Sequence, residues 1–471
     1  MPHLNTESLV PPDPSSTAGW RAPRAGAPVR GQVTVPASKS LTNRYLLLAA
    51  LAEGPSVVVN PLHSRDSRLM LQALQSLGAT IEHLQDWQGT GEDAVRVTPL
   101  PAQLRSGEAM VDCGLAGTVM RFLPAVAALT GLRTAFDGDP EARVRPMGAV
   151  LEGLRALGAE ITAEDTAGSA AIEYLPFTVH APEGISGGDI TIDASASSQF
   201  VSGLLLAAPR FAQGLTLHHS GTQVPSLEHV EMTLSVLNEL GVEVSSESPY
   251  TWHVEPGPIP AFTVRVEPDL SNAGPFLCAA VVTAGEVTMR GWPKRSTQIG
   301  RRWIQLLRDF GAEVRTAEEA GGDTLTLTVR GPEKIVSPGT VDGTAELTPT
   351  VAALAALAEG ETKFTSVQHL RGHETDRIAA LVAEIRRLGG GIEETDDGFR
   401  IFSPVTHGGM VKSYADHRMA TFGAVLGLAL DGVTVEDISC TSKTMPDFPA
   451  MWLKLVRGEA ADTALVGECT S

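Results

Sequence analysis

Aromatic side chains, cysteines and positive charges are all scarce in this sequence, and each shortage excludes a class of protein. Aromatic residues make up 5% of the 471 residues, so the core must be built from aliphatic side chains and alanine. The longest apolar runs, such as residues 352–358, are far shorter than the about 20 residues that a membrane-spanning helix needs. We therefore expect a chain that does not insert into a membrane.

Positive charge is in short supply relative to negative charge. Lysine and arginine number 36 against 55 aspartate and glutamate residues, which gives a net charge of -19. Nucleic acids and anionic lipid surfaces would be repelled by such a chain. The balance of charge argues against both as partners.

Cysteine is rare, and so is any targeting signal. Cys113, Cys278, Cys440 and Cys469 are far apart and match no metal-binding spacing, which predicts small buried side chains in a reducing cytoplasm. Residues 1–28 are rich in Pro, Ser, Thr and Ala and contain no apolar segment of the kind that a secretion signal has. We expect a cytoplasmic protein without a metal site, in which residues 1–28 form a flexible tail.

What the sequence does contain is an internal repeat. A glycine followed by a short β-branched run recurs six times, and successive glycines are 71 to 83 residues apart. A second glycine lies between these positions, after an apolar helix pattern, as expected of a helix C-cap; the sixth unit lacks it. The pattern therefore predicts that each unit is a small α/β subdomain with a strand, a buried helix, a strand, a second helix and a strand. The first glycines are Gly54, Gly131, Gly214, Gly285, Gly360 and Gly432, and the second are Gly78, Gly158, Gly241, Gly311 and Gly389.

Polar residues gather where each buried helix begins. The stretch from Ser38 to Arg44, for example, follows an alternating strand pattern and leads into the apolar run 45–51. A capped helix with two solvated bases would explain this stretch alone. It does not explain why Arg121 and Arg418 recur at the starts of other buried helices. Because helix N-termini attract anions, the pattern predicts a site for a small polyanion.

Seven short motifs in a fixed order point to a family. They are Ser38-Lys39-Ser40 with Asn43-Arg44, Leu115-Ala116-Gly117-Thr118 with Arg121, Arg145-Pro146, Ser197-Ser198-Gln199, Arg371-Gly372-His373-Glu374-Thr375-Asp376-Arg377, Asp416-His417-Arg418-Met419-Ala420 and Lys443-Thr444-Met445-Pro446-Asp447. From about Gly31 to about Val456 the chain resembles the 3-phosphoshikimate 1-carboxyvinyltransferase family, also called the EPSP synthases.

This resemblance implies a two-lobed α/β fold. Each lobe would contain three repeated βαβαββ units around buried parallel helices, an inside-out α/β arrangement, with the active site between the lobes. Lobe 1 would be discontinuous, formed by residues 29–37 and 269–471, and lobe 2 would span residues 38–268. The resemblance also implies a monomer that needs no cofactor and acts on small anionic substrates.

The implied reaction transfers the enolpyruvyl group of phosphoenolpyruvate to the 5-hydroxyl of shikimate 3-phosphate and releases phosphate. It requires a proton donor near the methylene carbon, a base near the hydroxyl, and fixed cations for two phosphates and two carboxylates. By resemblance, Glu374 is the donor, Glu346 the base, and Lys39 contacts both substrates. Asp416 and His417 would support the site. The residues implied for shikimate 3-phosphate are Lys39, Ser40, Arg44, Ser197, Ser198, Gln199, Ser226, Glu346 and His373, and those for phosphoenolpyruvate are Lys39, Gly117, Arg145, Gln199, Arg377, Arg418 and Lys443.

Four positions depart from the commonest family pattern. Leu115 replaces an asparagine, Glu346 an aspartate, His373 a lysine and His229 a tyrosine. Leu115 removes a side-chain hydrogen bond, and Glu346 reaches one methylene further. The departures change side chains expected to contact shikimate, but none removes an indispensable group.

Two alternatives remain open at this level. The related enolpyruvyl transferase that acts on UDP-N-acetylglucosamine shares the fold, but Ser38-Lys39-Ser40 with Arg44 argues against it, because a phosphate-binding arginine would have no partner in that sugar. A repeat protein that binds anionic metabolites without catalysis is the other. Glu346 and Glu374 disfavour it, since a pure anion site would avoid carboxylates.

Overall fold

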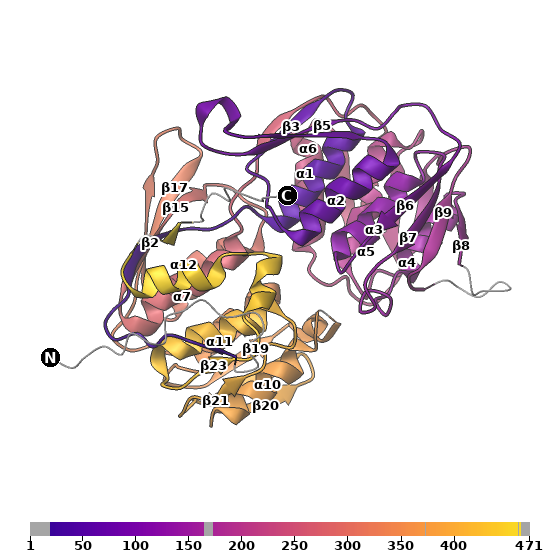
Figure 1. Ribbon diagram of the computed structural model, residues 1–471. Coiled ribbons are helices and arrows are strands. Elements are labelled where there is room, and N and C mark those ends of the chain that lie inside the picture. Colours follow the sequence, from indigo (N-terminus) through magenta and orange to yellow (C-terminus); the bar gives the residue numbers. More distant parts are fainter. Residues whose placement is uncertain (1–18, 164–172, 373, 460, 463–471) are drawn as a thin grey trace. The chain divides into compact units, whose positions relative to one another are not determined.

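The computed structural model describes residues 19–163, 173–372, 374–459 and 461–462 (Figure 1). The chain folds into two compact units. Unit 2 is the continuous segment Ala37–Val266, and unit 1 combines the preceding segment, up to Pro36, with the chain from Glu267 onward. Each unit has its own hydrophobic core, dominated by leucine, valine and alanine. The lobe boundaries expected from the sequence stay a prediction.

Unit 2 contains three four-stranded sheets that share one strand order. In each sheet the first strand is parallel to the second, and the remaining neighbours are antiparallel. In spatial order the strands are β14 (Thr263–Arg265), β3 (Ser56–Val59), β5 (Ala94–Thr98) and β4 (Thr80–Leu84); β6 (Glu108–Asp112), β7 (Arg133–Asp137), β9 (Phe177–His180) and β8 (Glu160–Thr162); and β10 (Gly188–Ile192), β11 (Leu215–His219), β13 (Thr251–Val254) and β12 (Val244–Ser248).

The helices of unit 2 fall into two kinds. Three are almost entirely buried, because their sequences offer no polar face to water: α1 (Lys39–Leu51), α3 (Gly117–Ala127) and α5 (Ser198–Ala207), with α5 packed against both others. In Figure 1 the strands β6, β7, β9 and β8 lie at one edge of the unit, outside α3 and α5. The remaining helices are α2 (Arg65–Leu77), α4 (Gly148–Ala156) and α6 (Glu228–Glu239), with the short 3₁₀ turns η2 (Trp87–Gly89) and η3 (Ala208–Arg210).

Unit 1 repeats this plan. Its buried helices α7 (Leu270–Thr283), α9 (Thr348–Ala355) and α11 (His417–Ala429) pack on one another. Its sheets, in spatial order, are β16 (Glu313–Glu318), β17 (Thr324–Arg330), β15 (Glu286–Pro293), β2 (Arg30–Thr34) and β24 (Ala461–Asp462); β18 (Thr340–Asp342), β19 (Thr362–Thr365), β21 (Gly398–Ser403) and β20 (Gly391–Thr395); and β22 (Met410–Val411), β23 (Thr434–Val435) and β1 (Trp20–Arg21). The other helical segments are α8 (Trp303–Asp309), α10 (Arg377–Arg387), α12 (Phe448–Val456), η4 (Ile299–Arg302), η5 (Ala345–Leu347), η6 (Gln368–Gly372) and η7 (Ser439–Lys443).

The prediction of six repeated α/β units is confirmed. All five glycines of the second set have positive φ, between 81° and 112°, as a left-handed helix C-terminus requires. The strand that comes before α1 in the chain does not pair in the same unit as α1. This strand, β2, pairs with β15 in unit 1, and β14 takes the corresponding place beside β3 in unit 2.

The prediction of a flexible tail over residues 1–28 is wrong for residues 20–22. β1 pairs antiparallel with β23, Trp20 is 7% exposed, and the Ala22 N–H donates to the Val433 carbonyl. Among the described residues, the sheet of β22, β23 and β1 lacks the hairpin that completes each of the other five sheets. β1 takes the third position in this sheet. Residues 1–18 lie outside the described part of the chain. In the described part, every helix is too short or too polar to span a bilayer.

Candidate active site

In unit 2 the three buried helices begin side by side. Asn43 Nδ2 donates to Thr118 Oγ1 at 2.6 Å, which joins α1 to α3, and Arg121 Nη1 donates to Gln199 Oε1 at 2.8 Å, which joins α3 to α5. Ser197 caps α5, and Ser38 caps α1 in the same way. Three helix dipoles therefore present their positive ends to one region of unit 2.

Lys39 and Ser40 open helix α1 at this region. The Lys39 ammonium lies 3.4 Å from a carboxylate oxygen of the buried Asp66, at the start of α2. Asp66 therefore holds the Lys39 side chain in place. Ser40 is half-buried, and its carbonyl accepts a hydrogen bond from the side chain of Arg44.

Arg44 differs from its expected role. Its guanidinium is 1% exposed and donates through Nε to Thr233, through Nη1 to the Ser40 carbonyl, and through Nη2 to Ser202 and to the His229 carbonyl. Burial lowers the pKa of Arg44 to about 9. The side chain that we expected to hold the shikimate phosphate thus joins α1, α5 and α6, so it no longer argues against UDP-N-acetylglucosamine as the substrate.

Around Gly117 the site is cationic and closely fitted. A β-carbon at this position would lie 2.9 Å from Gln199 Oε1, so only glycine leaves the contact between Gln199 and Arg121 undisturbed. Burial and the neighbouring Arg145 lower the pKa of Arg121 to about 10, and Arg121 Nε is buried without a hydrogen-bond partner among the described residues. Arg145 donates to the carbonyl of Leu115 at 3.1 Å. Two guanidinium groups that repel one another, one with a vacant donor, favour a bound anion.

Three serines complete the set in unit 2. Ser197 is the N-cap of α5, and Ser198, the first residue of that helix, is buried. Ser226 has a φ of 50°, in the left-handed region, and its buried hydroxyl has no hydrogen-bond partner among the described residues. A strained residue with an unsatisfied hydroxyl is typical of a ligand contact.

In unit 1 the starts of the buried helices also meet. Asp269 caps α7 and Asp416 caps α11. Ser271, in the first turn of α7, donates to Glu346 Oε1 at 3.2 Å, and Glu346 lies in η5 directly before α9. The carboxylate predicted to act as the base therefore projects from the point where these helices converge.

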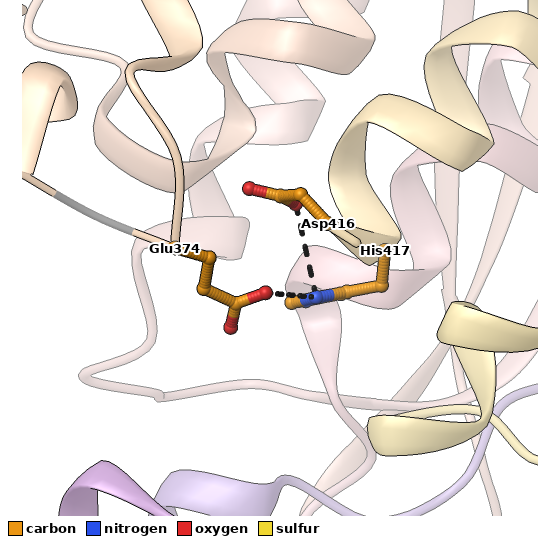
Figure 2. A group of neighbouring side chains, drawn as sticks. All are labelled: Glu374, Asp416 and His417. Atoms are coloured by element: carbon orange, nitrogen blue, oxygen red, sulfur yellow. Dashed lines mark hydrogen bonds and ion pairs between the residues drawn. The ribbon is translucent and has the colours of Figure 1, made fainter. Parts of the chain in front are cut away.

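Glu374 lies between a lysine and a histidine. Lys443 Nζ donates to Glu374 Oε1 at 2.6 Å, and His417 Nδ1 donates to Oε2 at 3.2 Å (Figure 2). Burial raises the pKa of Glu374, but His417, Lys443 and Arg377 outweigh it, so that the pKa lies well below its usual range. With its pKa lowered in this way, Glu374 is ionised at neutral pH. Burial lowers the pKa of His417.

Arg377 and Asp416 form a buried ion pair close to Glu374. Arg377 Nε donates to one Asp416 oxygen at 2.7 Å and Nη2 to the other at 3.2 Å. Although burial opposes both charges, the pair raises the pKa of Arg377 and lowers that of Asp416. Asp416 also accepts from the Arg418 N–H, so one carboxylate fixes Arg377 against the start of α11.

Glu374, Asp416 and His417 are close enough together to hold a metal ion. In Figure 2, dashed lines join the His417 ring to both Glu374 and Asp416. Each carboxylate is already paired with a cation, Glu374 with Lys443 and Asp416 with Arg377. Because these cations would repel a metal ion, we assign none to the cluster.

A brace that the sequence did not predict supports this cluster. Tyr414 and Ala415 both have left-handed φ angles, 54° and 52°, immediately before Asp416. The Tyr414 hydroxyl donates to the fully buried Glu384 at 2.6 Å, and the backbone N–H of Lys412 donates to the same carboxylate. Burial and this bond raise the pKa of Tyr414 to about 12. Glu384 thus ties α10 to the strained turn that presents Asp416.

The remaining expected residues are Arg418 and His373. Arg418 is buried and donates to Asn272 Oδ1 at 3.0 Å, while its Nε has no hydrogen-bond partner among the described residues. His373 lies outside the described residues. Asn272 was not singled out in the sequence, although it stands three residues after the Asp269 cap.

Comparisons with known proteins agree on one family. A sequence model of EPSP synthase (3-phosphoshikimate 1-carboxyvinyltransferase) matches residues 23–452. A 3-phosphoshikimate 1-carboxyvinyltransferase from Kocuria rhizophila is 52% identical over 444 residues, which cover 93% of this chain and 97% of that protein. Two structures of EPSP synthase from Acinetobacter baumannii superpose with TM-scores of 0.72 and 0.70 at 24% and 25% identity. They cover 94% and 91% of this chain, and 98% and 96% of their own. The chain belongs to the EPSP synthase family.

Proposed function

We propose that Glu374, Glu346 and the cations around them carry out the family reaction in distinct roles. As a member of this family, the chain transfers the enolpyruvyl group of phosphoenolpyruvate to the 5-hydroxyl of shikimate 3-phosphate and releases phosphate. The observation that carries the assignment of roles is Glu374, a largely buried carboxylate held between Lys443 and His417.

Glu374 supplies the proton that the methylene carbon of phosphoenolpyruvate gains. An ionised carboxylate cannot donate, so the pKa of Glu374 has to rise when substrate binds. The phosphate of phosphoenolpyruvate competes for the Lys443 ammonium, which lies 2.6 Å from Glu374 in this structure. Once Lys443 turns to the phosphate, burial acts on Glu374 with less opposition, and the carboxyl takes up a proton.

Glu346 accepts the proton of the attacking hydroxyl. The oxygen then bonds to the carbon that carries the phosphate, which gives a tetrahedral intermediate. Loss of a proton from the new methyl group and departure of phosphate restore the double bond. The hydrogen bond from Ser271 fixes the orientation of Glu346.

Two sets of residues hold the two anionic substrates, and Lys39 and Gln199 belong to both sets. Arg44 positions Ser40 through the Ser40 carbonyl instead of touching phosphate. We assign phosphoenolpyruvate to Lys39, Gly117, Arg145, Gln199, Arg377, Arg418 and Lys443, and shikimate 3-phosphate to Lys39, Ser40, Ser197, Ser198, Gln199, Ser226 and Glu346.

The thiol of Cys113 argues against the related transfer to UDP-N-acetylglucosamine. That reaction uses a cysteine in a mobile loop of the first lobe, whereas Cys113 is fully buried directly after β6. Burial raises the pKa of this thiol, which makes it a poor acid or nucleophile. We further propose that the protein works as a monomer in the cytoplasm.

Phosphate release with purified protein tests the proposal. Phosphoenolpyruvate with shikimate 3-phosphate should give continuous turnover, and phosphoenolpyruvate with UDP-N-acetylglucosamine should give none. A Lys39→Met variant should lose activity with the first pair. Turnover with the nucleotide sugar, or full activity of Lys39→Met, would contradict the proposed roles.

A further inference from the structure

Asn272 is a buried amide that joins three elements of unit 1. It lies in the first turn of α7 and is 4% exposed. Its Oδ1 accepts from Arg418 Nη1 at 3.0 Å and from Thr444 Oγ1 at 3.3 Å, and its Nδ2 donates to the Thr444 carbonyl at 3.2 Å. One side chain therefore connects α7 to α11 and to the residue that follows η7.

The two partners of Asn272 are linked to two cations. Arg418 is itself a cation, and its Nε is buried without a partner among the described residues. A guanidinium fixed at one nitrogen with a vacant donor at another is prepared for an oxyanion. Thr444 follows Lys443 directly, so its two hydrogen bonds hold the end of the turn that carries that ammonium.

We propose that Asn272 is a positioning residue that sets Arg418 and Lys443 together for the anionic groups of phosphoenolpyruvate. The inference rests on the proposed function. It explains why an amide stands at this position: only a group that both donates and accepts satisfies the Thr444 carbonyl and Arg418 at once. Aspartate would lose the donor and add a charge that competes with the substrate for Arg418. Alanine would leave Arg418 and the Thr444 carbonyl without these partners.

The test uses Asn272→Ala and the nearly isosteric Asn272→Asp. The Michaelis constant for phosphoenolpyruvate should rise by about 10-fold or more in both, the scale expected when a hydrogen bond to a charged group is lost. The constant for shikimate 3-phosphate should stay close to the wild-type value. Thr421→Val is the matched control, because the Thr421 hydroxyl donates to the backbone carbonyl of Arg418 and leaves its guanidinium untouched.

The control should lower the melting temperature while leaving both Michaelis constants unchanged. If the Asn272 variants also lose only stability, or weaken both substrates equally, the inference is wrong. If Asn272→Ala does not fold, the aspartate variant decides the question. If the variants fold but turn over too slowly to assay, calorimetric binding of each substrate replaces the kinetics. Failure of the wild type to release phosphate would instead refute the proposed function.

Discussion

Replacing Glu374 by glutamine removes one negative charge and preserves the shape of the side chain. The carboxylate lies 2.6 Å from Lys443 Nζ and 3.2 Å from His417 Nδ1, and the Glu374 and Lys443 side chains are 18% and 21% exposed. Loss of a charge-assisted hydrogen bond in such a place costs about 1–3 kcal/mol of unfolding free energy at pH 7. We expect less than for a fully buried pair, because Lys443 can turn toward water.

The cost should depend on pH, with a predictable sign. The pKa of Glu374 lies well below its usual range in the folded protein. Its contribution to stability is therefore complete above the unfolded pKa of about 4.3 and is lost as the pH falls through the folded pKa. Glutamine does not titrate in this way. The stability difference between wild type and Glu374→Gln should be largest near neutral pH and shrink in acid, which urea unfolding at a series of pH values measures.

Catalysis should suffer more than stability. Turnover of Glu374→Gln should fall by roughly 10²-fold or more, the scale of a lost general acid, while calorimetry still detects substrate binding. Glu394→Gln is the matched control, since Glu394 pairs with Arg371 at 2.9 Å on the exposed surface and should change neither quantity much. Near-normal phosphate release, or a stability difference that ignores pH, would refute this account of Glu374.

Gly117→Ala should raise the Michaelis constant for phosphoenolpyruvate, and the inhibitory concentration of glyphosate, more than the constant for shikimate 3-phosphate, because Gly117 is assigned to phosphoenolpyruvate alone and the new methyl intrudes at that point; equal effects in steady-state kinetics would contradict it. Tyr414→Phe should cost about 1–3 kcal/mol in urea unfolding by removing the donor to buried Glu384, and should lower turnover by loosening the turn before the site. Trp20→Ala should cost about 3 kcal/mol, the low end for a buried tryptophan, and an unchanged thermal transition would show that β1 contributes nothing.

The repeat and its helix ends could be predicted from the sequence because their causes are local. A glycine that closes a helix needs a positive φ wherever it occurs, and Gly78 shows it at 112°. Ser38 and Asp416 follow the same logic, since a cap bonds to the N–H groups that come next in the chain. These features depend on the neighbouring residues and on little else.

Arg44 and Asn272 could not be predicted in the same way. The Arg44 guanidinium is placed by Ser202 and Thr233, on helices that lie more than 150 residues further along. Asn272 meets Arg418 and Thr444 only after the helices of unit 1 have packed. A basic residue at a helix start predicts a positive charge at that point. The direction in which its side chain points depends on which later helix supplies the hydrogen-bond acceptors.

The position of β1 and β2 has a consequence for how the protein is made. Both strands leave the ribosome before unit 2, yet their partners β23 and β15 are synthesised long after it. Unit 2 can complete its core while these strands wait with unpaired edges, whereas unit 1 must close contacts across most of the chain. Folding should therefore be sequential, with unit 1 the slow and aggregation-prone partner, and a chaperone that shields the first strands would act on this step.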